Sequence, residues 1–164
     1  MRKGFFLFLI CTAICACQPP EVTSDEAEPI SALSSEEAVA QVREVFRQYQ
    51  ADWNAPNLDG VLGVLADDVV QMAPDTVFVG KDALAANWRE WFEERTDHWE
   101  PVIEDIRASK DLVFVLGHFV ETWTFVSSGE SDSSSGEGVW VFRRDEAGAW
   151  KLVLEQWFAT ESDA

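Results

Sequence analysis

Apolar residues in the first half of the chain repeat at intervals of three and four, which is typical of amphipathic helices. A first helix is predicted to begin at the capping-box pattern over 34–37. Its apolar stripe consists of Val39, Val42, Phe46, Tyr49 and Trp53. Pro56 interrupts this stripe, and a shorter second helix is predicted to follow it and to end near Asp68. A third helix is predicted after Gly80, and one of its faces carries Leu84, Trp88, Trp91 and Arg95.

The spacing of apolar residues changes to strict alternation after the third helix. Long strands are predicted over 99–109, 111–126, 137–144 and 149–159. The Ser/Gly/Asp-rich segment 127–136 is interpreted as a hairpin loop, and shorter extended segments lie at 69–72 and 77–79. Helices followed by a run of strands indicate an α+β fold, in which the helices cover one face of a curved antiparallel sheet.

The charge balance excludes one large class of partner. The chain of 164 residues contains 12 Lys and Arg against 30 Asp and Glu, so its formal net charge is −18. Such a surface repels the phosphate backbone of a nucleic acid, and no nucleic-acid partner is expected. The sequence also contains eight Trp and eleven Phe. These large apolar side chains predict a packed core rather than an acidic disordered chain.

A short export signal is predicted at the N-terminus. Two basic residues precede an apolar run over 4–16, which is too short to cross a bilayer as a helix. Residues 14–17 resemble the bacterial lipobox, which implies that Cys17 is acylated and anchors the protein to a lipid bilayer. An ordinary cleaved signal is the alternative. Gln18 after this cysteine resembles outer-membrane sorting in Gram-negative bacteria, so the periplasmic face of that membrane is the expected location.

The chain is therefore expected to contain one folded domain behind a tether. Its predicted parts are a signal peptide over 1–16, a lipid-anchored flexible linker over 17–33, the domain over 34–160 and a tail over 161–164. All three cysteines precede the domain, so neither a disulfide nor a cysteine-based metal site is expected inside it.

Several short motifs accompany this order of elements. They are Asn-Leu-Asp-Gly at 57–60, Leu-Ala-Asp-Asp-Val-Val at 65–70, Gly-Lys-Asp-Ala-Leu at 80–84 and Trp-Lys-Leu-Val at 150–153. In these features the chain, over 35–159, resembles the SnoaL-like branch of the nuclear-transport-factor-2-like superfamily. The resemblance implies a cone-shaped α+β fold, with three N-terminal helices packed in the concavity of a strongly curved, mainly antiparallel sheet. It also implies an apolar cavity and a homodimer formed through the sheet.

The resemblance leaves the activity open, because this fold hosts isomerases, cyclases, dehydratases, binding proteins and dimerising scaffolds. Ketosteroid isomerases use one carboxylate as a proton shuttle and a Tyr with a protonated Asp as an oxyanion hole. Aligned on the shared Ala-Asp-Asp motif, the shuttle falls at Ala73, the oxyanion Asp near Trp140 and the tyrosine at Tyr49. Two of the three groups are missing, so ketosteroid isomerase activity is not expected.

Two other carboxylates are candidates for acid-base chemistry. If Gly117 faces the helices, as the resemblance implies, the alternation of the strand also turns Glu121 inward, and the same reasoning places Glu155 on the cavity side. Burial among aromatic rings raises the pKa of a carboxyl group, which suits a general acid. Tyr49 is the candidate hydrogen-bond donor. In the alternative interpretation each Glu is a structural partner of Tyr49, a Trp N–H or Arg95, or lies at a wet rim.

Aromatic side chains supply most of the candidate ligand contacts. The predicted ligand-binding residues are Tyr49, Trp53, Met72, Trp88, Trp91, Trp123, Trp140 and Trp157. Together they suit a flat apolar ligand, although about half of the indoles are expected to serve only as core. His118 should face away from the cavity, and no metal-ligand spacing accompanies it or His98, so neither a metal nor another cofactor is expected.

Three functions are compatible with these patterns. The favoured one is a membrane-tethered protein that binds a small apolar or aromatic molecule. The second is a cofactor-free acid-base enzyme of the isomerase, cyclase or dehydratase type, with Glu121 or Glu155 as proton carrier. The third is a dimeric structural or interaction module whose cavity is filled core.

Overall fold

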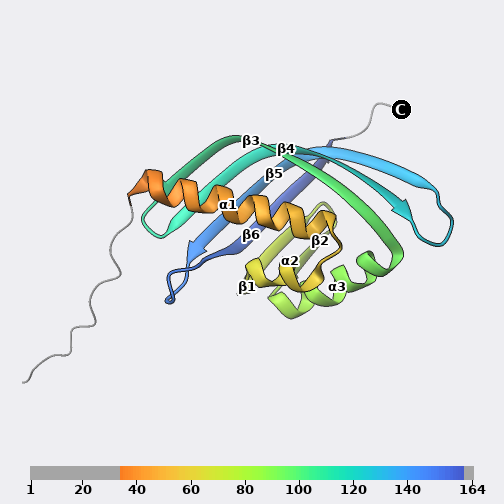
Figure 1. The fold of residues 1–164 in the computed structure, drawn as a ribbon, viewed down its shortest axis with the longest axis horizontal. Coiled ribbons are helices and arrows are strands. Elements are labelled where there is room, and N and C mark those ends of the chain that lie inside the picture. The colour runs from red at the N-terminus through yellow and green to blue at the C-terminus, as the bar shows by residue number, and fades with distance from the viewer. Residues whose placement is uncertain (1–33, 161–164) are drawn as a thin grey trace, which may run out of the picture.

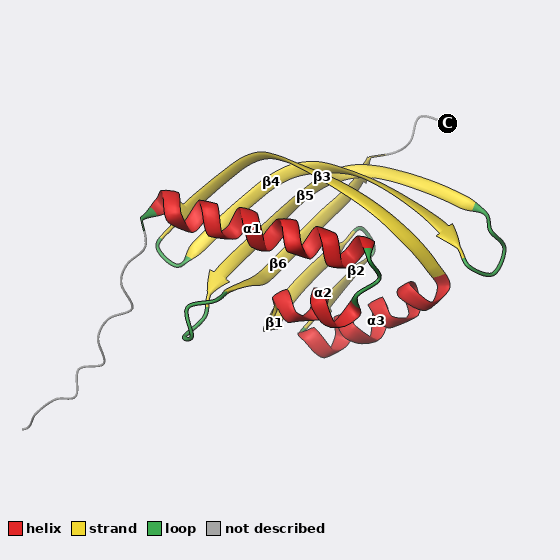
Figure 2. Cartoon of the chain, viewed as in Figure 1, coloured by secondary structure: helices red, strands yellow, loops and turns green. Residues whose placement is uncertain are grey.

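The computed structural model describes residues 34–160, which form three helices and six strands. In chain order they are α1 (Ser35–Asn54), α2 (Leu58–Val64), β1 (Leu65–Ala73), β2 (Thr76–Val79), α3 (Lys81–Glu94), β3 (Arg95–Ser109), β4 (Leu112–Phe125), β5 (Ser131–Arg144) and β6 (Trp150–Thr160). The expected signal peptide, the lipidation site at Cys17, the linker and the C-terminal tail lie outside the described residues. Helices followed by a long meander confirm the α+β prediction (Figure 2).

All six strands belong to one mixed sheet in the order β2-β1-β6-β5-β4-β3. The pairing of β1 with β6 is parallel and the other four pairings are antiparallel. A bulge between Ile103 and Asp105 shifts the register of β3 opposite Gly117. A Cβ atom at Gly117 would overlap the Val102 carbonyl oxygen, so only glycine allows the two strands to approach this closely. The sheet curves strongly along its length (Figure 1).

The helices lie against one side of this curved sheet. Helix α1 runs across β3 to β6, whereas α2 and α3 lie at the end formed by β1 and β2 (Figure 1). The capping box forms as predicted, because Ser34 Oγ accepts from the Glu37 backbone N–H at 3.2 Å and Glu37 Oε2 accepts from the Ser34 N–H at 3.0 Å. No helix in the described range has the length and apolar content needed to cross a membrane.

Aromatic rings dominate the core between α1 and the sheet. The Phe46 ring packs edge-on against Trp140, Trp99 and Phe142, with centroid distances of 5.0, 5.7 and 6.2 Å. Edge-to-face contacts of this kind are the favoured geometry of aromatic pairs. Because Trp140 folds over Gly138, where a Cβ atom would overlap the indole, this glycine makes room for a buried Trp side chain. The packing fixes α1 over the middle of the sheet.

The structure corrects three predicted boundaries. Arg95, predicted on the third helix, is the first residue of β3, which begins before the predicted start at 99. The second helix ends at Val64 rather than near Asp68, because Leu65 turns into an extended conformation and pairs with Leu152 of β6. Residues 131–136 belong to β5 rather than to a hairpin loop. Hydrogen bonds between hydroxyl groups support this polar half of the strand: Thr124 with Ser131 at 2.8 Å, and Ser135 with Thr160 at 3.0 Å. Backbone pairing therefore outweighs the low β propensity of the serine run.

Candidate functional site

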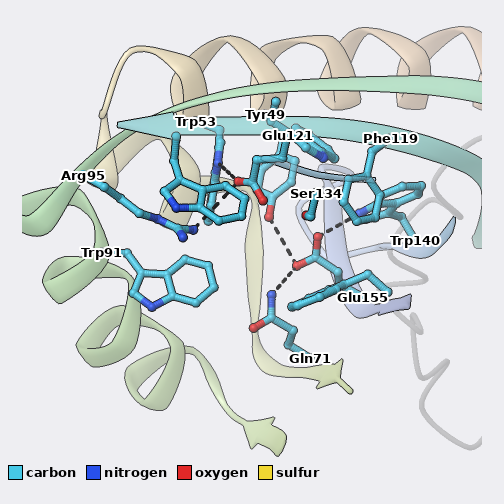
Figure 3. Close-up of a pocket in the computed structure, with 13 residues that line it drawn as sticks. Tyr49, Trp53, Gln71, Trp91, Arg95, Phe119, Glu121, Ser134, Trp140 and Glu155 are labelled. Atoms are coloured by element: carbon cyan, nitrogen blue, oxygen red, sulfur yellow. Dashed lines mark hydrogen bonds and ion pairs between the residues drawn. The ribbon is translucent and has the colours of Figure 1, made fainter. Parts of the chain in front are cut away.

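A pocket with a volume of about 250 Å³ opens between α1, the start of β3 and the inner face of the sheet. Its walls are mainly aromatic, and a few polar groups converge inside it (Figure 3). The lining residues are Tyr49, Trp53, Gln71, Trp91, Arg95, Trp99, Phe119, Glu121, Trp123, Ser134, Trp140, Glu155 and Trp157. An apolar cavity with a small number of placed polar groups is the usual form of a small-molecule site.

Glu155 of β6 lies at one end of the pocket and is held by three donors. Its Oε2 accepts from Gln71 Nε2 at 2.7 Å and from the Tyr49 hydroxyl at 3.4 Å, and its Oε1 accepts from Trp140 Nε1 at 2.8 Å (Figure 3). Burial raises the pKa of Glu155, and the bonds from Trp140, Gln71 and Tyr49 oppose that rise. Burial and the neighbouring carboxylate together raise the pKa of Tyr49 well above its ordinary value.

Glu121 of β4 belongs to a different electrostatic environment. Its Oε1 accepts from Trp53 Nε1 at 3.4 Å and lies 4.0 Å from Arg95 Nη2 (Figure 3). Arg95 Nε in turn lies 3.0 Å from Asp97 Oδ1, and the Asp97 side chain is fully buried. Burial raises the pKa of Glu121 to about 7, the charge of Asp97 adds to this rise, and Arg95 and Trp53 oppose it. Glu121 therefore changes its charge close to neutral pH.

Arg95 is clamped by aromatic rings as well as by acids. Its guanidinium carbon lies 4.3 Å from the centroid of Trp91 and 5.0 Å from that of Trp123. Both distances are within the range of cation–π attraction. Arg95 is the first residue of β3 and directly follows α3. The junction of these two elements therefore places the Arg95 guanidinium at the pocket rim. Its side chain is 14% exposed.

The structure brings together most of the residues predicted from the sequence. Both carboxylates, Tyr49 and the indoles of Trp53, Trp91, Trp123, Trp140 and Trp157 line the pocket. Trp88 and Met72 do not. Trp88 is fully buried in the core, where its ring packs edge-on against Trp53 at 5.2 Å. Gln71 lines the pocket in place of Met72. Alternation along β1 turns the buried Gln71 side chain inward and the Met72 side chain to the other face of the sheet.

Five lining residues are absent from the predicted set: Gln71, Arg95, Trp99, Phe119 and Ser134. Gln71 lies in the extended segment predicted over 69–72, which is too short to show a periodic pattern, although the observed strand covers Leu65–Ala73. Trp99 lies on the alternating stripe of β3, and Phe119 shares the inward face of β4 with Glu121, so strand alternation offered a signal for both. Ser134 is hidden in the serine run that was interpreted as loop.

The histidines lie apart from the pocket. His118 is exposed and lies 2.9 Å from Glu104, on the opposite side of β4 from Glu121, as predicted. His98 is exposed beside Glu100 at 3.2 Å. Within residues 34–160, no three His, Cys, Asp or Glu side chains gather in a way that would hold a metal ion. The chemistry that this pocket can offer is hydrogen bonding, aromatic stacking and proton transfer through its carboxyl groups.

Comparison with known proteins assigns the fold. A conserved protein from Planctomyces limnophilus is 19% identical with a TM-score of 0.70, and the match covers 76% of this chain and 99% of that one. A ketosteroid isomerase-like protein from Erwinia carotovora atroseptica is 23% identical with a TM-score of 0.70, over 77% and 98% of the two chains. No protein of curated function matches significantly.

A third structure, a nuclear-transport-factor-2-like superfamily protein from Salmonella enterica serovar Typhimurium, is 9% identical with a TM-score of 0.70, over 79% of this chain and 95% of that one. At such identities the shared property is the fold, which confirms the nuclear-transport-factor-2-like architecture. The model of the SnoaL-like domain matches residues 46–153, which include both pocket carboxylates. The chain belongs to the SnoaL-like domain family.

Proposed function

We propose that this protein binds a small aromatic or apolar molecule in the pocket between α1 and the sheet. The observation that carries the proposal is the lining itself, in which six indoles, Tyr49 and Phe119 surround a cavity of about 250 Å³. An apolar cavity of about 150 Å³ in another protein accepts benzene. The larger cavity here suits a fused two-ring molecule, and its aromatic walls favour a flat one.

The polar groups support binding with a fixed orientation. Glu155 has a full set of partners and closes one end, whereas Glu121 and Arg95 present charge near the other. A ligand that buried its rings against the indoles would place any polar substituent among these groups.

Native mass spectrometry of the full chain, exported by a bacterial host and gently purified, tests this proposal. We expect an additional mass that is lost on collisional heating. The variant Ser134→Phe fills the pocket from β5 and should lose this mass, whereas Ser133→Phe changes the exposed neighbouring position and should keep it. A clean unliganded mass for the unaltered protein, with no uptake of added aromatic compounds, would contradict the proposal.

A second candidate is an acid-base enzyme of the isomerase, cyclase or dehydratase type. It is favoured by one observation: Glu121 lines the pocket and its pKa is about 7, which suits proton transfer near neutral pH. Such an enzyme would exchange a carbon-bound proton of its ligand with solvent. Incubation of the co-purified ligand with the protein in D2O should then add deuterium, and Glu121→Gln should abolish the gain. Equal deuterium uptake with both proteins would exclude Glu121 as the proton carrier.

We also propose that acylated Cys17 tethers the domain to the periplasmic face of the outer membrane and that the domain forms a homodimer. Large apolar side chains support the dimer, because Phe114, Leu116 and Val120 are exposed on the side of β4 opposite the pocket. A Cys17→Ser variant should lose the acyl mass and its membrane fraction. Leu116→Glu should convert the dimer to a monomer in the same native spectra, and an unchanged monomer in both proteins would contradict the dimer.

A further inference from the structure

The charges around the pocket discriminate between ligands of the same shape. Two lining residues, Glu121 and Glu155, carry carboxyl groups, and the buried Asp97 carboxyl group lies beside Arg95. Among the lining residues, all within the described part of the chain, Arg95 is the one with a positive charge. Three carboxyl groups therefore accompany a single guanidinium group, which already contacts two of them, Asp97 at 3.0 Å and Glu121 at 4.0 Å. The positive charge of Arg95 is therefore already paired with Asp97 and Glu121 of the protein itself.

One oxygen of the Glu121 carboxylate is available to accept a hydrogen bond from a ligand. Its contacts with Trp53 and Arg95 are both made through Oε1, and its Oε2 accepts no hydrogen bond from any residue in the 34–160 range. Glu121 belongs to the pocket lining, and its side chain is 15% exposed. A carboxylate oxygen in a partly dry aromatic site is a strong acceptor for a charged N–H donor. Glu155, in contrast, uses both oxygens on Tyr49, Gln71 and Trp140.

The walls also suit a cation. Indole faces attract positive charge, and this lining already does so for Arg95, whose guanidinium lies between Trp91 and Trp123. The formal net charge of −18 adds a long-range field that draws cations towards the protein and repels anions. From these contacts we infer that the ligand is an aromatic amine, with its rings against the indoles and its protonated nitrogen on Glu121 Oε2.

This inference rests on the proposed binding function and narrows its ligand class. It carries a pH dependence, because Glu121 is the acceptor. The charged and titratable groups facing it are Tyr49 from α1, Arg95 and Asp97 from β3, and Glu155 from β6. Below the Glu121 pKa of about 7 an incoming cation must displace a proton. Affinity for an amine should therefore fall as the pH falls from 8 to 5, and binding should release protons.

Three probes with one ring system separate the charge from the shape: tryptamine, its neutral alcohol tryptophol, and the anion indole-3-acetate. Isothermal titration of the full chain, as processed by a Gram-negative host, should give tryptamine about a tenfold advantage over tryptophol at pH 8, since a charge-assisted bond is about twice as strong as a neutral one. Indole-3-acetate should bind most weakly. The advantage of tryptamine should disappear at pH 5.

Matched variants locate the effect. Glu121→Gln should abolish the preference for tryptamine over tryptophol. A thermal unfolding temperature at least as high as that of the unaltered protein at pH 8 shows that the variant folds. Glu137→Gln, which removes the same charge from an exposed position on β5, should keep the preference. Equal binding of tryptamine and tryptophol, or stronger binding of indole-3-acetate, would overturn the inference and leave the binding function intact. Failure of all three probes to bind would contradict both.

Discussion

The two pocket carboxylates have the same chemistry and opposite environments. Glu155 is fully enclosed and accepts hydrogen bonds from Tyr49, Gln71 and Trp140. Glu121 is 15% exposed, shares one oxygen between an indole N–H and Arg95, and leaves the other to the pocket. The comparison shows that position in a pocket does not by itself define a functional acid. The donors around each carboxylate decide whether it holds the fold or meets a ligand.

The same contrast defines the role of the Tyr49 hydroxyl. As a donor to Glu155, its hydroxyl helps to hold one end of the pocket and is not free for a ligand. The alternative considered from the sequence, in which an inward Glu is a partner of Tyr49 and a Trp N–H, therefore describes Glu155. The Arg95 and Trp53 contacts of Glu121 satisfy only half of its carboxylate.

Glu155→Leu should give the largest loss of stability. The substitution leaves three buried donors without an acceptor, and each unmet group costs about 1–3 kcal/mol. The free energy of unfolding in urea should fall by about 3–5 kcal/mol. The same change at Glu121 leaves the Trp53 N–H without an acceptor, while Arg95 keeps Asp97 as its counter-charge, and it should cost less than about 1.5 kcal/mol. Similar losses of unfolding free energy at both positions would contradict the claim that the two carboxylates differ in their structural role.

Arg95→Met should come next, with a loss of about 2–4 kcal/mol near neutral pH, because it leaves the buried Asp97 carboxylate without its counter-charge. Arg107 offers a matched control on the same strand. Its ion pair with Asp105 is largely exposed, so Arg107→Met should change the unfolding free energy by less than about 0.5 kcal/mol. The double variant Arg95→Met with Asp97→Leu should recover most of the loss, and failure to recover would point to lost packing on Trp91 instead.

Glu121→Gln should stabilise the protein at high pH. A carboxyl group whose pKa is raised to about 7 in the folded state favours folding when protonated, and this contribution is lost as the pH rises through the unfolded and then the folded pKa. The variant should therefore gain about 1–3 kcal/mol over the unaltered protein at pH 8 and little at pH 4. Thermal unfolding at both pH values checks this, with Glu137→Gln as the exposed control. A gain that does not depend on pH would contradict the raised pKa.

Tyr49→Phe should have the smallest effect. The hydroxyl is one of three donors to Glu155 and the longest of the contacts at 3.4 Å, so its loss should cost about 1 kcal/mol. Gln71→Leu, which removes the 2.7 Å donor, should cost more. A reversed order in chemical denaturation would show that the tyrosine hydroxyl, and not the Gln71 amide, anchors this carboxylate.

Sequence patterns predicted the fold and both acids for a clear physical reason. Strand alternation is local and has a period of two, so one reference position, Gly117, oriented Phe119, Glu121 and Trp123 along β4. The long amphipathic stripe of α1 placed Tyr49 and Trp53 in the same way. A register error of one residue would turn all three β4 side chains to the opposite face, so this prediction depends on the correct placement of Gly117.

The rest of the site depends on contacts between distant segments. Gln71 enters the pocket because the parallel pairing of β1 with β6 sets it beside Glu155, and nothing in its own nine-residue strand signals that. Ser134 is extended because it pairs with Glu121 of β4. The hydrogen-bond pattern that separates Glu121 from Glu155 is likewise a product of the tertiary structure.

A titration of the glutamate carboxyl carbons by NMR, in the free protein and with saturating tryptamine, tests the central claim most directly. Glu121 should titrate near pH 7 in the free protein and at a lower pH with the amine bound, because a cation on its free oxygen favours the ionised form. Glu137→Gln should leave both curves unchanged. A Glu121 curve with an ordinary midpoint, or one that does not move when the amine occupies the pocket, would contradict the claim that this carboxylate receives the ligand.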